Sequence, residues 1–353
     1  MSDEDIHQGF KNWPEKTSTS PSTRHLSHYK SLFAINGDDP NDPSHDSAGS
    51  EILEMHKDLM NLCLKHGYAL KRWLKVLNAM LEKEIGRPLL HKLRIIHIIE
   101  ADYNLILKTI FGRRLLWNCE DNKILHQNQW GGRPGRSTQD LLLQKELSYD
   151  IAMRALINTI EIENDAKACY DRLIPGLVML VYRARGLSKN ACKLRGTMLE
   201  QAQYFTSTKL GISETSYSHS NENPIFGLGQ GTGDAGVGWT NVSDILMKIM
   251  DDKSNGLILQ SPDGIYSYKR TMAAFVDDTQ CGTNDFQQKQ SLLDLINKAQ
   301  FDIQWWADLL HASGGLLEID KCFYYATTWE FDHQGNPTAR HAQPSDPTVT
   351  ITQ

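Results

Sequence analysis

The chain has 353 residues, of which 40% are hydrophobic and 23% are charged, a balance typical of a soluble globular protein with a large core and more than one subdomain. Its six cysteines are scattered and form no C-x-x-C pair, which argues against a zinc site or a disulfide framework and favours a reducing, intracellular setting. The start MSDEDIHQGFKNW is polar and acidic, so we expect neither a signal peptide nor a transit peptide, and no apolar run approaches the length of a membrane span.

Charge is distributed unevenly along the chain. The whole chain has a formal net charge of −6, but the segment from Lys83 to Arg136 holds ten Lys or Arg against five Asp or Glu. A basic block beside an acidic body suits a protein that grips phosphates with one part and metal ions with another. A solvated helical surface explains the same charges equally well, so both interpretations stay open.

The N-terminal part is predicted as an arm, a surface loop and helices. Residues 1–48 form the arm, which runs into a loop at 36–50 because Asp, Pro, Ser and Gly crowd that stretch. Helical spacing follows up to Gly67 as a stop, and again from Trp73 onward. The apolar faces of the two helices consist of Ile52, Met55, Leu59 and Cys63, and of Trp73, Leu77, Met80 and Leu81. We expect both faces to belong to the core.

Two later segments place carboxylates at strand ends. A helix is predicted from Asp140 to about Ile157, and NTIEIEND then alternates apolar and acidic residues up to Asp165. The stretch YSYKRTMAAFVDD predicts another strand, which ends at Asp277 and Asp278. Asp is common in hairpin turns, and this explains the pair without any function. Alternatively, carboxylates from neighbouring strands hold divalent cations, whose charge offsets the repulsion and dehydration of the acids.

A glycine-rich loop lies between these two segments. The sequence FGLGQGTGDAGVG precedes an amphipathic helix that carries Trp239, Val242, Leu246 and Ile249. Glycine allows close approach of a ligand backbone, and a loop that enters a helix suits phosphate or base contacts. Such loops also occur as plain connectors, and this spacing is neither a P-loop nor a dinucleotide fingerprint.

Six segments in order carry a family resemblance. NDAKACYDRL, GLGQGTGD, AAFVDDTQCG and GGLLEIDKCFYY resemble motifs A, B, C and D of reverse transcriptases, particularly those of non-LTR retrotransposons and related mobile elements. Upstream, KLRIIHIIEADYNLILKTIFGRRL looks like the fingers segment of that family, and HQNQWGGRPGRSTQDLLL resembles its Q-x-G-F-R-x-G-R-S-T-x-D pattern. The resemblance runs from about Lys83 to Tyr325.

The resemblance implies an α+β right-hand polymerase fold. Mostly helical fingers would occupy residues 49–149, and an antiparallel palm sheet with motifs A to D would occupy 150–330, followed by a tail at 331–353. Little sequence follows Tyr325, so we expect the helical thumb to be missing or truncated.

The resemblance also implies catalytic residues. Asp165 and Asp277 would bind the catalytic Mg²⁺, with Mn²⁺ as a possible substitute, and Asp278 would add negative field close by. Asp171 competes with Asp165 for this role, but the segment has already turned helical there. Lys321 matches the motif D lysine, suited to protonating the pyrophosphate leaving group, and an exposed structural lysine is the alternative.

Further residues are assigned to nucleotide and template. Tyr170 stands where the family places an aromatic gate against a ribose 2′-hydroxyl, although ordinary packing of a half-buried Tyr is the alternative. Gln230 matches the motif B glutamine beside the incoming nucleotide and template base. Lys92 and Arg94 would grip the triphosphate. Template phosphates would be contacted by Arg133 and Arg136.

The sequence departs from the family pattern in the glycine loop. Gly229 replaces a motif B proline and TGDAG replaces a Ser-Pro stretch, so we expect a looser loop. The expected reaction is addition of deoxynucleotides to a DNA primer 3′-hydroxyl on an RNA template, by a fragment of a retrotransposon polyprotein. Alternatives are an inactive nucleic-acid-binding remnant and an RNA-dependent RNA polymerase, against which Tyr170 speaks.

Overall fold

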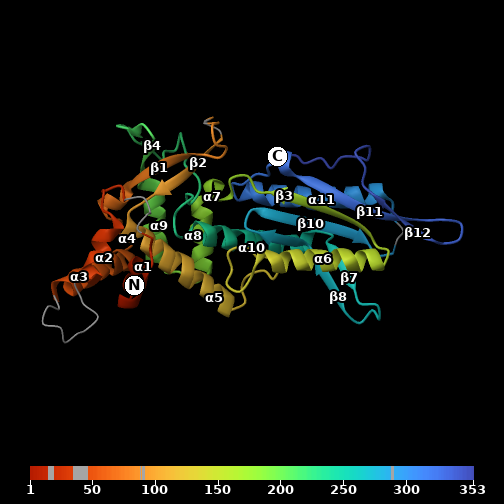
Figure 1. Ribbon diagram of the computed structural model, residues 1–353, viewed down its shortest axis with the longest axis horizontal. Helices are drawn as coiled ribbons and strands as arrows, with labels where there is room; N and C mark the ends of the chain where they lie inside the picture. Colours follow the sequence, from red (N-terminus) through yellow and green to blue (C-terminus); the bar gives the residue numbers. More distant parts are fainter. Residues whose placement is uncertain (15–19, 35–46, 88, 90–91, 288–289) are drawn as a thin grey trace. The chain divides into compact units, whose positions relative to one another are not determined.

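The structure is a computed structural model that describes residues 1–14, 20–34, 47–87, 89, 92–287 and 290–353. The chain divides into two compact units: unit 1 comprises Met1–Lys123 and Leu173–Gly238, and unit 2 comprises Ile124–Arg172 and Trp239–Gln353. Both units combine helices with sheets (Figure 1), so the predicted α+β class with an antiparallel sheet is confirmed. The boundaries assigned to arm, fingers, palm and tail stay predictions.

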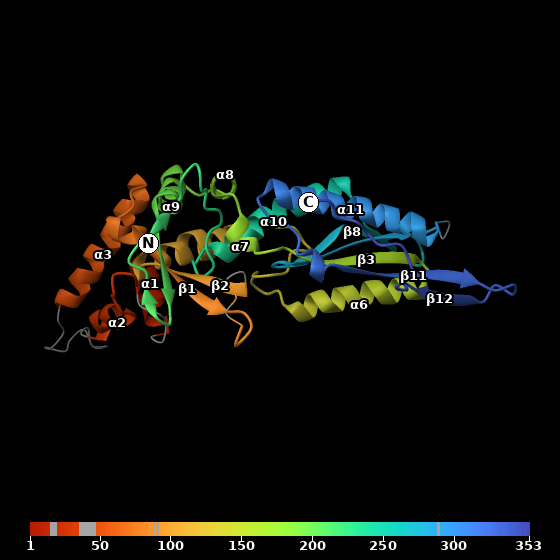
Figure 2. The same cartoon turned by 90° about the horizontal axis from the view of Figure 1, so that it is seen from above.

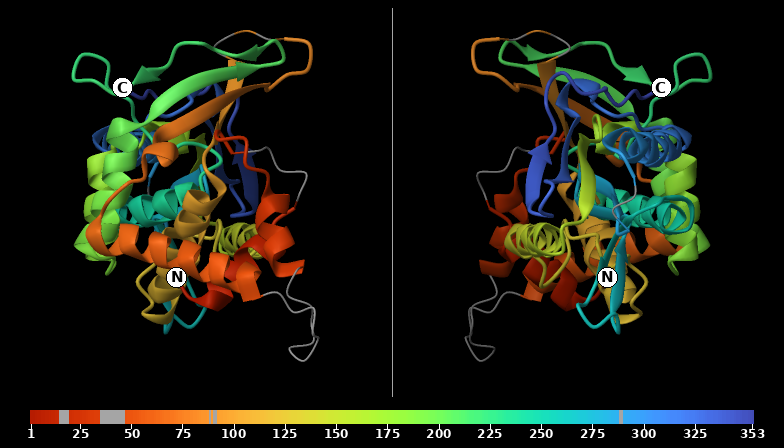
Figure 3. Two further views of the ribbon diagram at one scale, coloured as in Figure 1. Left: turned by 90° about the vertical axis from the view of Figure 1, so that its left-hand side faces the viewer. Right: turned by 90° about the vertical axis from the view of Figure 1, so that its right-hand side faces the viewer.

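Unit 1 is mostly helical and carries one mixed sheet. Its helices are α1 (Asp3–Lys11), α2 (Leu26–Ala34), α3 (Ser47–His66), η1 (Lys71–Leu74), α4 (Ala101–Ile106), the π-helix η3 (Leu107–Arg114), α5 (Leu115–Asp121), α8 (Pro175–Ala184) and α9 (Lys189–Gln201). Its strands are β1 (Lys75–Glu82), β2 (Leu93–Ile98), β4 (Gln203–Thr208), β5 (Gly211–Ile212) and β6 (Tyr217–Ser218). The sheet order is β2–β1–β4–β5, with β6 also pairing with β4. In the left view of Figure 3, this sheet lies above the helices of the unit.

The prediction of a second helix, from Trp73 onward, is wrong. Residues from Trp73 to Leu81 form the short 3₁₀ turn η1 and then strand β1, which pairs antiparallel with β2 and parallel with β4. Apolar spacing in so short a run fits either period. Pairing on both sides decides for the strand, and Val76 and Asn78 then face the interior together.

The first predicted helix exists, but its apolar face differs from the expected one. Helix α3 ends at His66, and Gly67 follows with φ +65°, as the predicted stop requires. Cys63 is buried, with Met60 beside it on the buried face, whereas the other three predicted core residues are exposed. These are Ile52, Met55 and Leu59. Of the predicted loop at 36–50, residues 36–46 lie outside the described residues, and the rest belongs to α3.

Unit 2 is built on an antiparallel sheet. Its strands are β3 (Asn158–Asp165), β9 (Met272–Phe275), β10 (Asp278–Asp285), β11 (Phe323–Phe331) and β12 (Pro337–His341), with a separate hairpin of β7 (Leu257–Gln260) and β8 (Ser267–Arg270). The helices are α6 (Thr138–Arg154), α7 (Cys169–Arg172), α11 (Leu292–Ala312), η4 (Ile319–Lys321) and α10 (Ala235–Lys253), which begins within the range of unit 1. The order β12–β11–β3–β10–β9 places β3 and β10 at the centre.

Helices cover both faces of this central sheet (Figure 2). On one face, the Trp306 indole of α11 donates to the Asn164 side chain at 3.0 Å. On the other, Lys145 of α6 donates to Glu163 at 3.0 Å. Successive side chains of a strand point to opposite faces, so the alternation of β3 places its apolar residues towards α11 and its acids towards α6. The predictions of helix α6, of strand β3 ending at Asp165 and of helix α10 are confirmed.

Candidate functional site

The ends of two central strands bring the predicted carboxylates together in unit 2. In the antiparallel pairing of β10 with β3, Asp278 lies directly opposite Asp165. Strand β9 pairs with β10 through Phe275 and Asp278, so Val276 and Asp277 are the only residues of the connecting turn. The backbone N–H of Ala166 donates to the Asp277 carbonyl at 3.1 Å. The hairpin therefore fixes all three carboxylates at one end of the sheet.

The turn itself is strained and firmly held. Val276 has φ +60°, a conformation that a β-branched residue rarely adopts. The Trp239 indole donates to the Val276 carbonyl at 2.6 Å. A Cβ added to Gly131 would lie 2.3 Å from the Val276 nitrogen, so the backbone of Gly131 packs directly on the turn. Strain of this kind persists where the surroundings over-determine it, and it clusters at functional sites.

The electrostatics of the three carboxylates are those of a crowded anionic site. Burial raises the pKa of Asp277, and the charges of Asp278 and Asp165 raise it further. The pKa of Asp278 is raised first by burial and then by Asp165. Lys321 opposes both shifts, and it forms an ion pair with Asp165 that raises the pKa of the lysine. Lys321 is 66% exposed, so this pair contributes at most about 1 kcal/mol.

Tyr170 lies in the same neighbourhood. It belongs to α7, and burial raises its pKa to about 12, with further contributions from Cys169 and Asp277. The role of Tyr170 as a gate stays a prediction. Asp171, the competing acid, is helical as expected.

Beside the carboxylates is a polar network that the sequence did not assign. Glu163 lies two residues before Asp165 on the same face of β3 and accepts hydrogen bonds from Lys145 and, at 2.8 Å, from Gln280. Gln280 also donates to the Tyr325 hydroxyl at 2.6 Å. The alternation of Ile and Glu in NTIEIEND carried the signal, since it placed two acids and Asp165 on one face.

The two predicted template-binding arginines brace a loop of unit 2. Arg133 is 7% exposed and donates to the carbonyls of His126 at 2.7 Å and Gln129 at 2.8 Å. Arg136 lies 4.8 Å from the centre of the Trp130 ring and donates to a backbone carbonyl. These contacts hold the loop that carries Gly131 against the turn. Template binding by either arginine stays a prediction.

The remaining predicted residues lie in unit 1. Lys92 forms an ion pair with Glu84 at 2.9 Å, and Arg94 is an exposed residue of β2 opposite Leu81. The carbonyl of Gln230 accepts a hydrogen bond from the His97 N–H at 2.7 Å, which ties the glycine loop to β2. The roles of Lys92, Arg94 and Gln230 at a nucleotide stay predictions.

The expectation of a loose glycine loop is wrong, because its glycines are sites of close packing. A Cβ on Gly229, whose φ is +84°, would lie 2.0 Å from the His97 ring, and one on Gly231 would lie 2.9 Å from the His97 carbonyl. A Cβ on Gly233 would lie 2.7 Å from the Lys108 backbone. Burial lowers the pKa of His97 to about 4, so a neutral ring fills the space beside Gly229 at pH 7.

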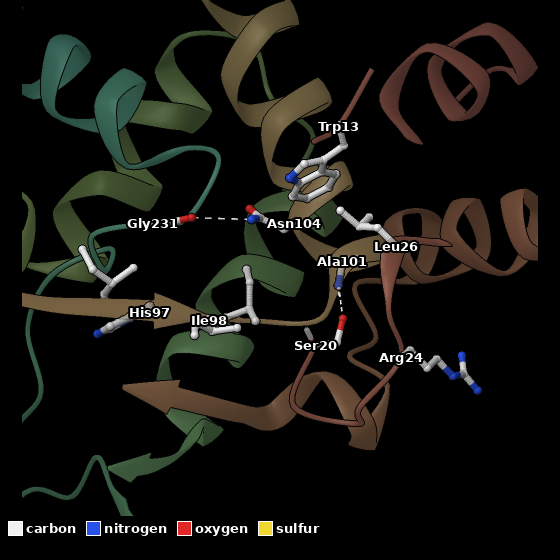
Figure 4. Close-up of a pocket in the computed structure, with 11 residues that line it drawn as sticks. Trp13, Ser20, Arg24, Leu26, His97, Ile98, Ala101, Asn104 and Gly231 are labelled. Carbon is white, nitrogen blue, oxygen red and sulfur yellow. Dashed lines mark hydrogen bonds between the residues drawn. The ribbon is translucent and has the colours of Figure 1, made fainter. Parts of the chain in front are cut away.

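A cavity of about 140 Å³ lies next to this loop in unit 1 (Figure 4). Its lining includes Trp13, Leu26, Ile98, Asn104 and Gly231. Figure 4 shows the Asn104 amide reaching towards the Gly231 carbonyl, at 3.5 Å, across one side of the cavity. Asn104 of α4 thus supports the loop at Gly231.

The donor chemistry of the carboxylate end suits a hard divalent cation. Carboxylate oxygens are the ligands that Mg²⁺ and Mn²⁺ prefer. As the side chains stand, with Lys321 on Asp165, no three His, Cys, Asp or Glu side chains of the described ranges gather closely enough to hold a metal ion. Metal binding by Asp165, Asp277 and Asp278 therefore requires these side chains to come closer together than they stand.

No family model and no curated protein matches the chain. Solved structures with similar folds include three telomerases. Telomerase from Candida tropicalis in complex with a TWJ fragment of telomeric RNA is 13% identical, with a TM-score of 0.47, over 79% of this chain and 45% of that chain. Apo telomerase from Candida tropicalis truncated from its C-terminal domain is 13% identical, with a TM-score of 0.48, over 77% of this chain and 55% of that chain. Telomerase from Candida albicans in complex with the TWJ fragment is 11% identical, with a TM-score of 0.45, over 77% of this chain and 45% of that chain. The chain spans about half the length of these telomerases.

All three TM-scores lie below 0.5. Among the helices of the described residues, none is both long and apolar enough to cross a membrane.

Proposed function

We propose that the chain is an RNA-directed DNA polymerase, a nucleotidyltransferase derived from a retrotransposon or related element. The observation that carries the proposal is the register of β3 and β10, which sets Asp165 opposite Asp278 and beside the turn of Asp277. The reverse-transcriptase motifs of the sequence fall on these same residues. The likeness in fold to telomerases agrees with the proposal without supporting its details.

In this proposal, Asp165 and Asp277 hold Mg²⁺ and Asp278 adds negative field. When bound, the metal lowers the pKa of an attacking hydroxyl and stabilises charge on the leaving oxygens. The primer 3′-hydroxyl gives up its proton to solvent and its oxygen bonds to the α-phosphorus of a deoxynucleoside triphosphate, while the bond from that phosphorus to the bridging oxygen of the β-phosphate breaks to release pyrophosphate. Lys321, already beside Asp165, would donate a proton to that leaving group.

Tyr170 would exclude a ribose 2′-hydroxyl and so favour deoxynucleotides. Its half-buried ring near Asp277 has the bulk for this role. Lys92, Arg94 and Gln230 would act on the nucleotide, and Arg133 and Arg136 would face the template side. An RNA template and a DNA primer are the partners that this assignment requires.

Primer extension tests the proposal. Purified protein is given a poly(rA) template, an oligo(dT) primer, Mg²⁺ and labelled dTTP, and the wild type is compared with Asp277→Asn and with Asp171→Asn as the matched control. We expect extension by the wild type and by Asp171→Asn, and none by Asp277→Asn. Folded wild-type protein that binds the primer–template without extending it would instead support the second candidate function, a nucleic-acid-binding remnant.

A further inference from the structure

A buried ion pair in unit 1 holds the end of the glycine loop. Arg195 of α9 is 3% exposed, and Asp234, directly before α10, has no exposed surface. The guanidinium Nε and Nη2 each lie 2.9 Å from one oxygen of the Asp234 carboxylate. Such a bidentate pair is directional as well as strong, because the planar fork accepts only one orientation of its partner.

The same guanidinium also holds the beginning of the loop. Its Nη2 donates to the Leu228 carbonyl at 2.8 Å. The Thr232 hydroxyl lies 3.0 Å from the Asp234 carboxylate and 3.0 Å from the Gly229 carbonyl, which closes the loop on itself. One buried side chain thus ties together both ends of the loop, and Gln230 lies between them.

The opposite side of the loop is held by neutral groups. Besides the bond from the His97 N–H to the Gln230 carbonyl, the Gly233 N–H donates to the Asn104 side-chain oxygen at 2.7 Å. Figure 4 shows Asn104 and His97 on two sides of the loop segment at Gly231. Gly229 and Gly231 of the loop pack against β2 and Gly233 packs against η3, and Arg195 is a buried charged anchor of the loop.

We infer that Arg195 is a positioning residue for deoxynucleotide binding, which acts through Asp234 and the Leu228 carbonyl to set the place of Gln230. This inference rests on the proposed function, because it assigns Gln230 to the nucleotide. Arg195 itself is fully enclosed and touches no substrate. A buried ion pair is weak evidence for a role in stability, since dehydration of two charges opposes their attraction, whereas its fixed geometry suits a role in position.

The test separates position from stability by removing both charges together. Arg195→Met alone leaves a buried, uncompensated carboxylate and is expected to destabilise the fold. The double variant Arg195→Met/Asp234→Leu removes both charges, keeps an apolar core and loses the hydrogen bonds to the loop. We expect it to unfold at the same urea concentration as the wild type. Arg72→Met, which breaks the ion pairs of Arg72 with Glu100 and Asp102 and removes no group that bonds the loop directly, is the control for destabilisation alone.

Two readouts decide the inference. In primer extension, the double variant should raise the KM for dTTP about tenfold or more, with a smaller change in kcat, since a small misplacement of a binding group has effects of this size. Arg72→Met should leave KM unchanged. In hydrogen exchange, the His97 amide, which is bonded to Gln230, should exchange at least about tenfold faster in the double variant. Amides of β1 should not change.

A double variant with wild-type KM and wild-type exchange at His97 would overturn the inference, because the ion pair would then only fill the core. If the wild type extends no primer, the proposed function fails. The exchange rate of the His97 amide then tests only whether Arg195 sets the place of Gln230, which faster exchange upholds and unchanged exchange overturns. The role in deoxynucleotide binding fails together with the proposed function.

Discussion

Substitution of Gly229 by alanine tests how tightly the glycine loop is packed. The new Cβ meets two obstacles, a backbone at φ +84° and the His97 ring, whose nearest atom would lie 2.0 Å away. The left-handed conformation costs an alanine about 1–2 kcal/mol. Forcing a methyl group into a packed space costs about 1–3 kcal/mol more. We therefore expect Gly229→Ala to lower the free energy of unfolding by about 2–5 kcal/mol.

Gly86 provides a matched control for this prediction. Its φ is +81°, but a Cβ added there meets nothing within 4 Å. Gly86→Ala should therefore show only the backbone cost, about 1–2 kcal/mol, and effects of the added methyl group on the unfolded chain cancel between the two variants. Urea unfolding followed by circular dichroism measures both. In a His97→Ala background, the extra cost at Gly229 should disappear, and equal costs at Gly229 and Gly86 in the wild-type background would refute the packing described for the loop.

Three other predictions concern unit 2. Burial and neighbouring acids raise the pKa of Asp277 in the folded protein, so the ionised carboxylate destabilises the fold at pH 7. Below the ordinary Asp pKa of about 3.9 the carboxyl is mostly protonated in both the folded and the unfolded chain, and this destabilisation is largely lost. Asp277→Asn should therefore raise the free energy of unfolding at pH 7 but not at pH 3.5, which urea titrations at the two pH values measure. Tyr170→Ala should lower the ratio of the rate of dTTP incorporation to the rate of UTP incorporation in primer extension. An unchanged ratio would indicate that Tyr170 only packs against its neighbours. Arg270→Met leaves the buried Glu161 carboxylate unpaired and should lower the free energy of unfolding in urea by about 3–5 kcal/mol. Lys145→Met breaks a more exposed pair with Glu163 and should lower it by at most about 1 kcal/mol. Equal decreases in the two variants would contradict the role given to burial.

Sequence reasoning located the strand ends that matter. Alternation ending at Asp165 is a local pattern that predicts β3 correctly. The single strand predicted over YSYKRTMAAFVDD is wrong, because the stretch forms β8 in the separate hairpin and β9 in the central sheet, where β10 lies between β9 and β3. Local patterns failed where long-range pairing decides. The segment from Trp73 to Leu81 has helical spacing, but two partner strands make it β1.

The glycine loop shows a second limit of the sequence. A glycine in a sequence indicates either a flexible backbone or a site of close packing, and only the residues that contact it in the fold distinguish the two. His97 and Lys108 lie more than a hundred residues before the loop, and their contacts turn flexible residues into closely packed ones. No sequence pattern predicted a role for Arg195, because its burial and its ion pair with Asp234 follow only from the packing of α9 beside the loop.

The central claim is that the carboxylates of β3 and β10 carry metal-dependent nucleotide transfer. Single-turnover incorporation of one dTMP into a preformed RNA template–DNA primer complex measures it most directly, with the wild type, Asp165→Asn and the control Asp171→Asn compared at several Mg²⁺ concentrations. We predict Mg²⁺-dependent incorporation by the wild type and the control, and a loss of roughly 100-fold or more in Asp165→Asn. Incorporation by Asp165→Asn at the wild-type rate would contradict the claim.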